Sequence, residues 1–316
     1  MSIIHSRFAP VALTGLTITE RLFQGLEHRA GEAVMVDGPT GRSLTAGAVM
    51  DGIRRLAGGL AARGHGPGKI IAILAPNMPD YVVAFHGALY AGCTVTTLNP
   101  SYTATEVRHQ LSNSGASLLI TVPAFLATAR EGATGTGVTE IVLMGEGDAP
   151  PLSSLMGDAL AAQVPVDVAR DTAVLPYSSG TTGLPKGVML THRNLVVNID
   201  QAQAMVQIQP GEWTVGFLPF FHIYGLTVLM NLHLAAGAGV VTMPRFDLEM
   251  FLRLCAEYRT PTVFCAPPVV VALAKHPMVD QFDLSAVKRL FSGAAPLRGD
   301  LAAAVGRRMQ VEAVQG

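Results

Sequence analysis

The sequence predicts an α/β fold made of two βαβ-type, mostly parallel sheets flanked by helices. Two observations lead to this prediction. Short continuous apolar runs alternate with helix-like patterns through most of the chain, and such runs are typical of strands covered on both faces. In addition, 49% of the residues are hydrophobic and only 14% are charged, as expected for a large buried core. No repeat of fixed period is visible, which argues against solenoids and propellers.

The first half of the chain begins this alternation with the run Lys69–Ala75, which predicts a buried strand. A helix is expected next, because a proline is favourable in the first helical turn. The other elements of this half follow in the same order. They are a helix over Pro79–Ala91, a strand over Thr94–Leu98, a helix over Thr103–Ser114 and a strand over Ser117–Val122.

The second half repeats the pattern, and Thr191 is a plausible N-cap for its first helix. The expected strands are Val174–Tyr177, Trp213–Leu218, Gly239–Met243, Thr262–Ala266 and Val287–Ser292. The expected helices are Thr191–Gln207, Ile223–Ala235, Leu248–Tyr258, Pro268–Lys275 and Leu297–Arg308.

A glycine- and proline-rich segment between Thr134 and Gln163 interrupts the alternation. Clusters of these residues are typical of loops. We therefore expect a boundary near residue 165, with a first α/β subdomain over residues 1–165 and a second, carrying the chemistry described below, over residues 166–316. This boundary is approximate, and it allows the N-terminal segment to pack on the second subdomain.

Composition excludes several classes of function. The net charge is −1, from 22 basic and 23 acidic residues, so no basic excess exists for nucleic-acid binding. Three scattered cysteines form no C-x-x-C pair and suggest neither a disulfide framework nor a zinc site.

No signal-peptide pattern is visible. The longest apolar stretch, Gly225–Met243, contains Asn231 and His233, and reads as a buried helix plus strand rather than a transmembrane span. We expect a soluble cytoplasmic protein.

The strongest chemical signal directly follows the strand that ends at Tyr177. It reads Ser178-Ser-Gly-Thr-Thr-Gly-Leu-Pro-Lys-Gly187. Glycines let a backbone bend and present its N–H groups, while the hydroxyls and one lysine add further donors. Many short donors beside one cation suit a polyphosphate. Walker A, G-x-G-x-x-G, G-x-S-x-G and H-E-x-x-H patterns are all missing from the sequence.

This segment resembles the phosphate loop of the adenylate-forming superfamily, which includes acyl-CoA synthetases, 4-coumarate–CoA ligases, luciferases and peptide-synthetase adenylation domains. The resemblance extends along the chain, and is greatest to the 4-coumarate–CoA ligase-like branch. The other segments that carry it are Ala75-Pro-Asn77, Gly92-Cys-Thr-Val-Thr-Thr-Leu-Asn-Pro100, Leu218-Pro-Phe-Phe-His-Ile-Tyr-Gly225, Ala266-Pro-Pro268 and Ser292-Gly-Ala-Ala-Pro-Leu297.

The resemblance implies roles for residues in these motifs. The residues expected to hold the ATP phosphates are Ser178, Ser179, Gly180, Thr181, Thr182, Gly183 and Lys186. Lys186, His222 and Thr182 are the expected catalytic residues, and Thr182 is also expected to help place Mg²⁺. His222 is expected beside the substrate carboxylate, although a lone histidine in a core or at a helix cap would look the same.

The remaining expected site residues lie near the end of the chain and in one helix. The residues expected to border the acyl group are Tyr224, Val228, Gly293 and Ala294, with Gln315 and Gly316 as the last members of the pocket. Tyr224 and Val228 would share a helical face. Ala294, Ala295 and Pro296 are expected to border the adenine. Arg245 is equally well explained as a CoA contact and as a solvated surface residue.

The resemblance implies an ATP-dependent acyl- or aryl-CoA ligase that forms an acyl-AMP from a hydrophobic carboxylic acid and then a CoA thioester. ATP, Mg²⁺ and CoA are thus the expected cofactors and co-substrates. The chain ends where a Gly-Tyr-Gly-x-Thr-Glu-like motif should begin, so it resembles an incomplete large N-terminal domain without the small C-terminal domain. We expect such a chain to self-associate and not to complete ligation. A non-catalytic nucleotide- or acyl-binding fragment, a structural protein and a peptide-synthetase adenylation domain are the alternatives.

Overall fold

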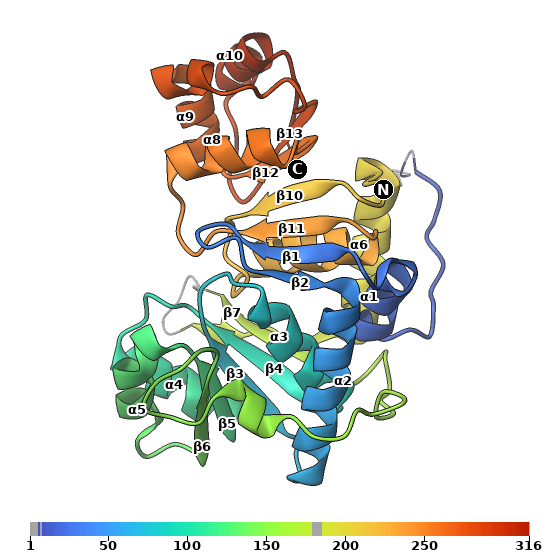
Figure 1. The fold of residues 1–316 in the computed structure, drawn as a ribbon, viewed down its shortest axis with the longest axis vertical. Helices are drawn as coiled ribbons and strands as arrows, with labels where there is room; N and C mark the ends of the chain where they lie inside the picture. The colour runs from blue at the N-terminus through green and yellow to red at the C-terminus, as the bar shows by residue number, and fades with distance from the viewer. Residues whose placement is uncertain (1–5, 7, 179–184, 316) are drawn as a thin grey trace, which may run out of the picture.

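The computed structural model describes residue 6, residues 8–178 and residues 185–315. These residues form an α/β fold with mostly parallel sheets flanked by helices, which confirms the predicted fold class (Figure 1). The strands of this part of the chain lie in three sheets, whereas the sequence suggests two. An N-terminal strand pairs with Gly239–Thr242, and the last three described strands pair with one another in a sheet of their own.

The largest sheet has the strand order β6-β5-β3-β4-β7-β8, with β9 also paired to β7. All pairings from β6 to β7 are parallel. Helices pack on both of its faces, and alternate residues of its strands point to opposite cores. Its strands are β3 (Ile70–Leu74), β4 (Thr94–Leu98), β5 (Leu118–Thr121), β6 (Glu140–Leu143), β7 (Thr172–Ser178), β8 (Lys186–Gly187) and β9 (Leu190–Thr191).

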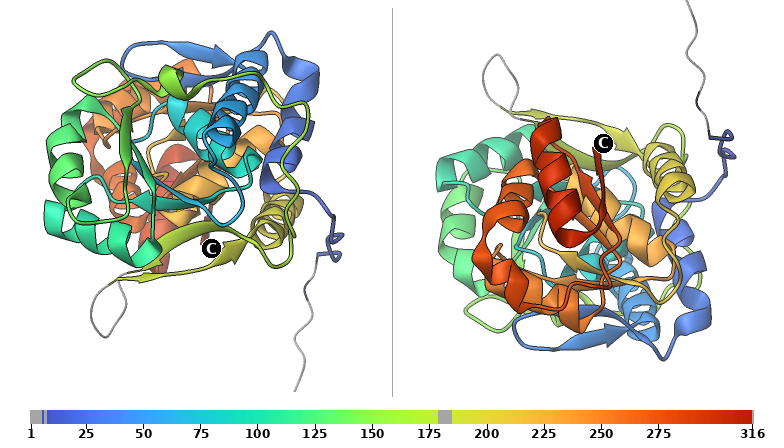
Figure 2. Two further views of the ribbon diagram at one scale, coloured as in Figure 1. Left: turned by 90° about the horizontal axis from the view of Figure 1, so that it is seen from below. Right: turned by 90° about the horizontal axis from the view of Figure 1, so that it is seen from above.

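Seven helices belong to this sheet or to the layer beside it. Figure 2 shows α4 and α5 on one side of the molecule, and α1 and α6 on the opposite side. Thr17, Thr103 and Thr191 each begin a helix with a capping box, which satisfies free N–H groups at the helix start. The helices are α1 (Ile18–Leu26), α2 (Ala46–Ala62), α3 (Asp80–Tyr90), α4 (Ala104–Ser114), α5 (Leu126–Ala133), α6 (His192–Val206) and α7 (Leu232–Ala235).

The second sheet combines two strands from the first 45 residues with two strands from residues 213–242. It has the order β10-β11-β1-β2, with β1 parallel to β11. Its strands are β1 (Ala33–Asp37), β2 (Ser43–Thr45), β10 (Trp213–Gly216) and β11 (Gly239–Thr242). β7, from beyond residue 165, meanwhile pairs with β4 of the largest sheet. Strands from both sides of the suggested boundary near residue 165 therefore share sheets, and the boundary remains a prediction.

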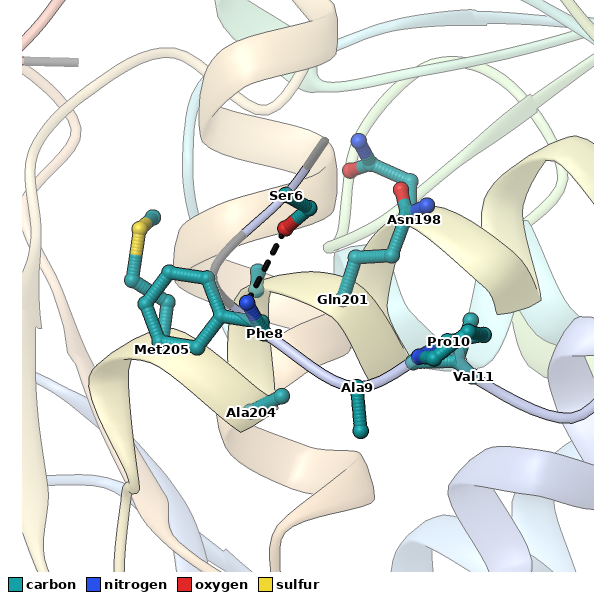
Figure 3. Close-up of a pocket in the computed structure, with 10 residues that line it drawn as sticks. Ser6, Phe8, Ala9, Pro10, Val11, Asn198, Gln201, Ala204 and Met205 are labelled. Carbon is teal, nitrogen blue, oxygen red and sulfur yellow. Dashed lines mark hydrogen bonds between the residues drawn. The ribbon is translucent and has the colours of Figure 1, made fainter. Parts of the chain in front are cut away.

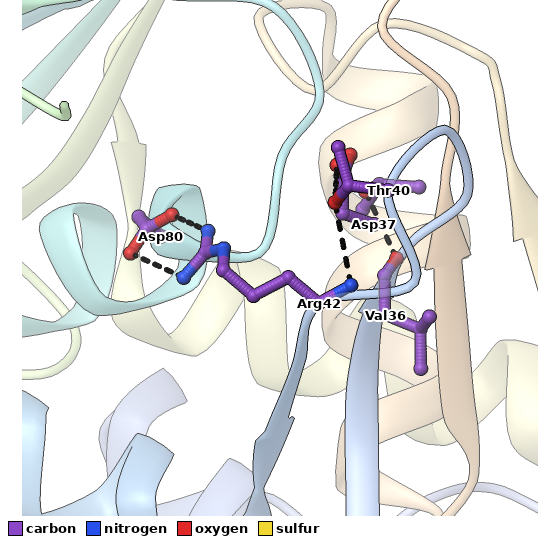
Figure 4. Close-up of polar contacts among 6 residues, drawn as sticks. Val36, Asp37, Thr40, Arg42 and Asp80 are labelled. Carbon is purple, nitrogen blue, oxygen red and sulfur yellow. Dashed lines mark hydrogen bonds and ion pairs between the residues drawn. The ribbon is translucent and has the colours of Figure 1, made fainter.

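An ion pair holds the turn between β1 and β2 against the largest sheet's helix layer (Figure 4). The Arg42 guanidinium faces the Asp80 carboxylate, with one Nη1–Oδ1 distance of 3.3 Å. Asp80 is the first residue of α3, where the helix dipole also favours a negative charge. In the same turn, the Thr40 hydroxyl donates to Asp37 and accepts from the Arg42 backbone N–H.

The third sheet, at the top of Figure 1, is the parallel order β12-β13-β14. Its strands are β12 (Thr262–Cys265), β13 (Arg289–Ser292) and β14 (Glu312–Gln315). Its helices are α8 (Leu248–Glu257), α9 (Pro267–Lys275) and α10 (Gly299–Met309). Single-turn 3₁₀ segments complete the described chain, namely η1 (Glu27–Arg29), η2 (Pro123–Phe125), η3 (Leu152–Leu155) and η5 (Pro277–Gln281).

Two local expectations are corrected by the structure, and one expected helix has an unexpected interior. The segment 134–163, read as loops, contains β6, because its Glu140–Leu143 run pairs with β5. The helix expected over Ile223–Ala235 is present with these bounds, but its interior is the π-helical η4 (Gly225–Asn231), which is followed by the short α7. β10 stops at Gly216 rather than Leu218, because the Asn77 side chain binds the carbonyl groups of both residues.

The described helices include none that is long and apolar enough to span a bilayer. The stretch Gly225–Met243 is instead η4, α7 and β11, almost wholly buried in the core. This agrees with the buried helix-and-strand interpretation of its sequence.

Candidate functional site

The candidate site lies where parallel strands of the largest sheet end. The carboxyl ends of β3, β4 and β7 meet at one edge of that sheet, which is where open α/β sheets generally bind ligands. Asn99 follows β4, and Ser178 is the last residue of β7. The loop Phe217–Tyr224, which follows β10 of the second sheet, is held over this edge by hydrogen bonds to Asn77 and Thr97.

A cavity of about 300 Å³ opens between this loop and the end of β7. It brings together two motifs that are 44 residues apart in the sequence, since both Ser178 and His222 line it. The other lining residues are Thr97, Asn99, Tyr102, Pro176, Tyr177, Val188, Leu190, Phe221 and Ile223.

A short antiparallel ribbon carries the predicted phosphate loop. Ser178 pairs with Lys186, and Tyr177 pairs with Gly187. Gly187 allows this approach, because a Cβ at that position would lie 3.1 Å from the Tyr177 ring. The Tyr177 hydroxyl donates to the Asn113 side chain, and burial raises the pKa of this phenol. The ribbon thus brings the exposed Lys186 beside Ser178, which lines the cavity, although Lys186 is not itself a described lining residue.

Five of the predicted phosphate-binding residues cannot be placed. Ser179, Gly180, Thr181, Thr182 and Gly183 lie outside the described residues. The assignment of Mg²⁺ to Thr182 therefore remains a prediction. Within residues 8–178 and 185–315, no group of three or more histidine, cysteine or acidic side chains could hold a metal ion.

His222 adopts a defined tautomer in its neutral form. Its Nδ1 accepts the backbone N–H of Tyr224 at 3.2 Å, so the ring proton resides on Nε2. Partial burial lowers the pKa of His222, because it penalises the charged imidazolium. The ring that lines the cavity is therefore neutral near pH 7 and can donate one hydrogen bond from Nε2.

A second cavity, of about 520 Å³, adjoins the first through the shared residues Leu190 and Ile223. Tyr224 and Val228 both line it, as their spacing predicts. Burial raises the pKa of Tyr224 to about 12, so its phenol stays neutral. The remaining lining residues are Asn194, Leu195, Asn198 and Thr227.

Gly293 is in direct contact with Tyr224. A Cβ on Gly293 would lie 2.9 Å from the Tyr224 Oη atom and 3.0 Å from Cζ. The structure therefore brings together two residues that the sequence predicts to border one ligand, although they are far apart in the chain. Ala294 follows with a φ of 69°, a left-handed conformation that is rare for alanine and turns the backbone sharply.

The residues expected near adenine form an exposed turn, Ala294–Pro296, after β13. Gln315 lies beside this turn, since its Oε1 accepts the Leu297 backbone N–H at 3.3 Å. Gly316 is outside the described residues. Arg245 lines a separate cavity of about 380 Å³, which meets the first cavity at Asn99 and Phe221.

One further cavity, of about 520 Å³, lies between the N-terminal segment and α6 and contains none of the predicted site residues (Figure 3). Phe8 and Met205 flank it in Figure 3, and it shares only Asn198 with the cavity beside Tyr224.

Sequence reasoning missed several residues that line the two central cavities. Thr97 and Asn99 lie within the quoted Gly92–Pro100 segment, so their motif was recognised without a role for either side chain. Asn194, Asn198 and Thr227 had no comparable signal, because they are polar helix residues whose neighbours only the tertiary structure reveals.

Comparison with known proteins places these motifs in one family. The model of the AMP-binding enzyme family matches residues 23–316. The chain belongs to this family. Among curated relatives, it is 36% identical over 309 residues to 4-coumarate–CoA ligase 5 of Oryza sativa subsp. japonica, and 37% identical over 293 residues to 4-coumarate–CoA ligase 1 of Petroselinum crispum. These alignments cover 95% and 90% of this chain, but 56% and 53% of the relatives.

Solved structures show the same fold. A red-emitting luciferase from Phrixothrix hirtus superposes with a TM-score of 0.88 at 25% identity, over 96% of this chain and 60% of the luciferase. A long-chain-fatty-acid–CoA ligase from Archaeoglobus fulgidus gives a TM-score of 0.90 at 24% identity, over 98% and 65% of the two chains. The protein therefore has the fold of the larger, N-terminal part of adenylate-forming enzymes and spans little more than half the length of its curated relatives.

Proposed function

We propose that the protein activates a hydrophobic carboxylic acid with ATP as an acyl-AMP, for transfer of the acyl group to the thiol of CoA. That these 316 residues do not complete the transfer by themselves stays a prediction. One observation carries the proposal: Ser178, at the start of the phosphate loop, and His222 line the same cavity. Membership of the AMP-binding enzyme family and the similarity to proteins named 4-coumarate–CoA ligases support it.

The proposed first step needs alignment and charge dispersal. The acid's carboxylate oxygen attacks the α-phosphorus of ATP, forming the acyl-AMP bond while the bond to pyrophosphate breaks. Lys186 and the hydroxyls of the loop would hold the β- and γ-phosphates, and such positioning supplies most of the catalysis of phosphoryl-type transfers. Mg²⁺, when bound with Thr182 among its ligands, would neutralise phosphate charge. The neutral His222 would donate from Nε2 to the carboxylate and fix its orientation.

In the proposed second step, the CoA thiolate attacks the acyl carbonyl carbon and AMP leaves. Arg245 is the proposed contact for CoA. Its cavity adjoins the one that holds His222, which supports this role.

The acid proposed for this site is apolar along most of its length. Tyr224, Val228, Leu195 and Ile223 line the 520 Å³ cavity, and no acidic side chain is found among its described lining residues. An amino-acid substrate would leave its ammonium group without a partner there, which is costly in an apolar site. Hydroxycinnamates, benzoate-like acids and medium-chain fatty acids all remain candidate substrates.

Acid-dependent exchange of labelled pyrophosphate into ATP tests the proposal, because it reports the first step alone. A panel of hydroxycinnamates, benzoates, fatty acids and amino acids should give exchange with one of the first three classes. Exchange that needs an amino acid would favour a peptide-synthetase adenylation domain. Binding of ATP without exchange for any acid would contradict the enzyme and favour a non-catalytic binding module.

A further inference from the structure

Three motifs remain without a role in the proposed reaction, and two of them are Ala75-Pro-Asn77 and Gly92–Pro100. They follow or form the adjacent parallel strands β3 and β4, and so end at the same sheet edge as β7. Each motif contains one buried polar side chain, Asn77 or Thr97, that forms hydrogen bonds with the segment leading to His222. Neither of the two side chains reaches the Ser178–Lys186 ribbon in any hydrogen bond of the described residues.

Both polar atoms of the Asn77 side-chain amide form hydrogen bonds with the backbone of this segment. Its Nδ2 donates to the carbonyl oxygens of Gly216 at 2.8 Å and Leu218 at 2.9 Å, and its Oδ1 accepts the Phe220 N–H at 2.7 Å. The side chain is only 4% exposed. The bonds to Leu218 and Phe220 replace the strand pairing that the backbone loses after Gly216, because buried polar groups need partners. The Gly216 carbonyl also accepts the Met243 N–H.

Thr97 holds the same loop one residue before His222. Its hydroxyl donates to the Phe221 carbonyl oxygen at 2.7 Å. Thr97 is 2% exposed, and its own backbone carbonyl accepts a hydrogen bond from Gln110 of α4, so the strand end is itself braced. The loop is thus bonded at positions 216, 218, 220 and 221, immediately before the histidine.

We propose that Asn77 and Thr97 are positioning residues that set the place of the His222 ring relative to the acid. Four directed bonds hold the backbone up to residue 221, and the bond from the Tyr224 N–H to the His222 Nδ1 orients the ring beyond it. Preorganisation of this kind matters because a shift of about 1 Å in a catalytic group can cost about 100-fold in rate. The claim about the ring stands on the structure alone, whereas the claim about the acid rests on the proposed function.

The test compares Thr97→Val with Thr94→Val in the full chain described here. Both substitutions remove a hydroxyl on β4 that donates to a carbonyl oxygen, but Thr94 bonds Thr172 at the opposite end of the strand. Asn77→Asp is the second test variant, since it keeps the acceptor and the size while removing both Nδ2–H donors. Equal urea midpoints for the two threonine variants would show that any difference between them is local.

Two readouts separate positioning from stability. The first is the titration of the His222 ring followed by NMR, with the resonance assigned from a His222→Gln variant. The second is the affinity for a sulfamate analogue of 4-coumaroyl-AMP. We expect Thr97→Val to move the His222 titration and weaken the analogue by roughly three- to tenfold, as the loss of one hydrogen bond does. Asn77→Asp loses two hydrogen bonds and should have a larger effect on both readouts. Thr94→Val should change neither readout.

The outcomes are distinguishable. An unchanged His222 titration in both Thr97→Val and Asn77→Asp would overturn the positioning role, whether or not the chain binds the analogue. A moved titration with unchanged analogue affinity would uphold the positioning of the ring while removing His222 from the proposed substrate site. That second result would count against the proposed function alone.

Discussion

Single residues decide the shape of the cavity proposed for the acid. Gly293 from the third sheet and Tyr224 from the loop beside the largest sheet touch there, and no side chain larger than hydrogen fits between them at the observed spacing. The tyrosine in turn stays neutral because burial raises its pKa to about 12. Gly293 is not among the described lining residues of the cavity, so it acts on the cavity through the position of the Tyr224 ring.

Gly293→Ala is expected to destabilise the protein by roughly 1–3 kcal/mol, because the new methyl group would overlap the Tyr224 ring. Tyr224→Leu should reduce this cost in the double variant, since it removes the ring atoms that the methyl group meets. Urea unfolding of the two single variants and the double variant measures the coupling. Additive losses would show that the two residues do not touch.

His222 links protonation to the proposed chemistry. Its Nδ1 accepts a hydrogen bond from Tyr224, and protonation of Nδ1 abolishes that bond. Because the pKa of His222 is lowered, pyrophosphate exchange should hold through pH 7 and decline only as the pH falls below about 6.5, the ordinary histidine value. His222→Asn should lower exchange by about 100-fold and remove this acid limb. An acid limb that persists in His222→Asn would assign it to another group.

At the residue scale, prediction from sequence was good where a motif carried the information. Lys186 and Ser178 pair across a ribbon, and Tyr224 contacts Gly293, although nothing in their spacing alone requires either contact. Asn77 and Thr97 lay in recognised motifs, but their roles were not predictable. Both act on a backbone more than 120 residues away, as the Thr97 bond to Phe221 shows.

Among the elements, α2 shows how packing overrides helix propensity. Gly58 and Gly59 lie inside this helix, where glycine is normally unfavourable. The segment Leu155–Leu160 lies directly on them, with the Gly157 N–H donating to Arg55 and the Leu160 N–H to Arg54. The glycines therefore let a connecting segment with little regular structure bond to the helix surface.

Gly59→Ala is consequently expected to destabilise the protein by roughly 2 kcal/mol or more, although helix propensity alone predicts a gain of about 1 kcal/mol. A Cβ at this position would lie 1.7 Å from the Leu155 carbonyl oxygen. Gly299→Ala in α10 is the matched control, because nothing lies within 4 Å of its Cβ position. Thermal unfolding that ranked Gly59→Ala at or above the wild type would contradict the packing argument.

Three helices each bury one neutral histidine between the sheets, His86 in α3, His192 in α6 and His233 in α7. Burial lowers the pKa of His86 to about 3 and those of the other two to about 4. His86 is also bonded on both ring nitrogens, to Thr19 and to Asn231. None of the three can take up a proton in the fold near pH 5.

Stability should therefore be constant above about pH 6.5 and decline between about pH 6.5 and pH 4, because only the unfolded histidines take up protons there. The free energy of unfolding should fall by roughly 2–4 kcal/mol per pH unit near pH 5.5. Urea titrations at several pH values measure this slope, and His86→Gln should reduce it by about one third. A slope unaffected by His86→Gln would show that His86 is protonated in the fold.

At this scale most helices and strands from residue 69 onward were predictable, because each carries a local hydrophobic period. The earlier elements α1, β1, β2 and α2 were not predicted. The π-helical η4 was not, since its sequence reads as an ordinary apolar helix. Its Asn231 bonds His86 of α3, and this tertiary contact lies outside any local pattern. β6 was missed because its short apolar run is surrounded by glycines and prolines.

In the whole molecule, the pairing of distant strands builds the site. β1 joins β11 across about 200 residues, and β7 joins β4 across about 80 residues. Alternating patterns predicted parallel sheets but not which strands share one, because any two apolar strands can pair. This arrangement matters for function. The Ser178–Lys186 ribbon lies at the edge of the largest sheet, whereas the loop with His222 follows β10 of the second sheet. The proposed site therefore exists only when both sheets are packed together.

Calorimetric titration of this chain with Mg-ATP, for the wild type, Lys186→Met and the exposed control Lys69→Met, tests the central claim most directly. Lys69 precedes β3, at the opposite edge of the sheet. Loss of a charge-assisted bond to phosphate should weaken ATP by roughly tenfold or more in Lys186→Met alone. The sulfamate analogue of the acyl-adenylate, which lacks the β- and γ-phosphates, should bind this variant as it binds the wild type. Equal ATP affinities in all three proteins would contradict the assignment of the loop and, with it, the proposed function.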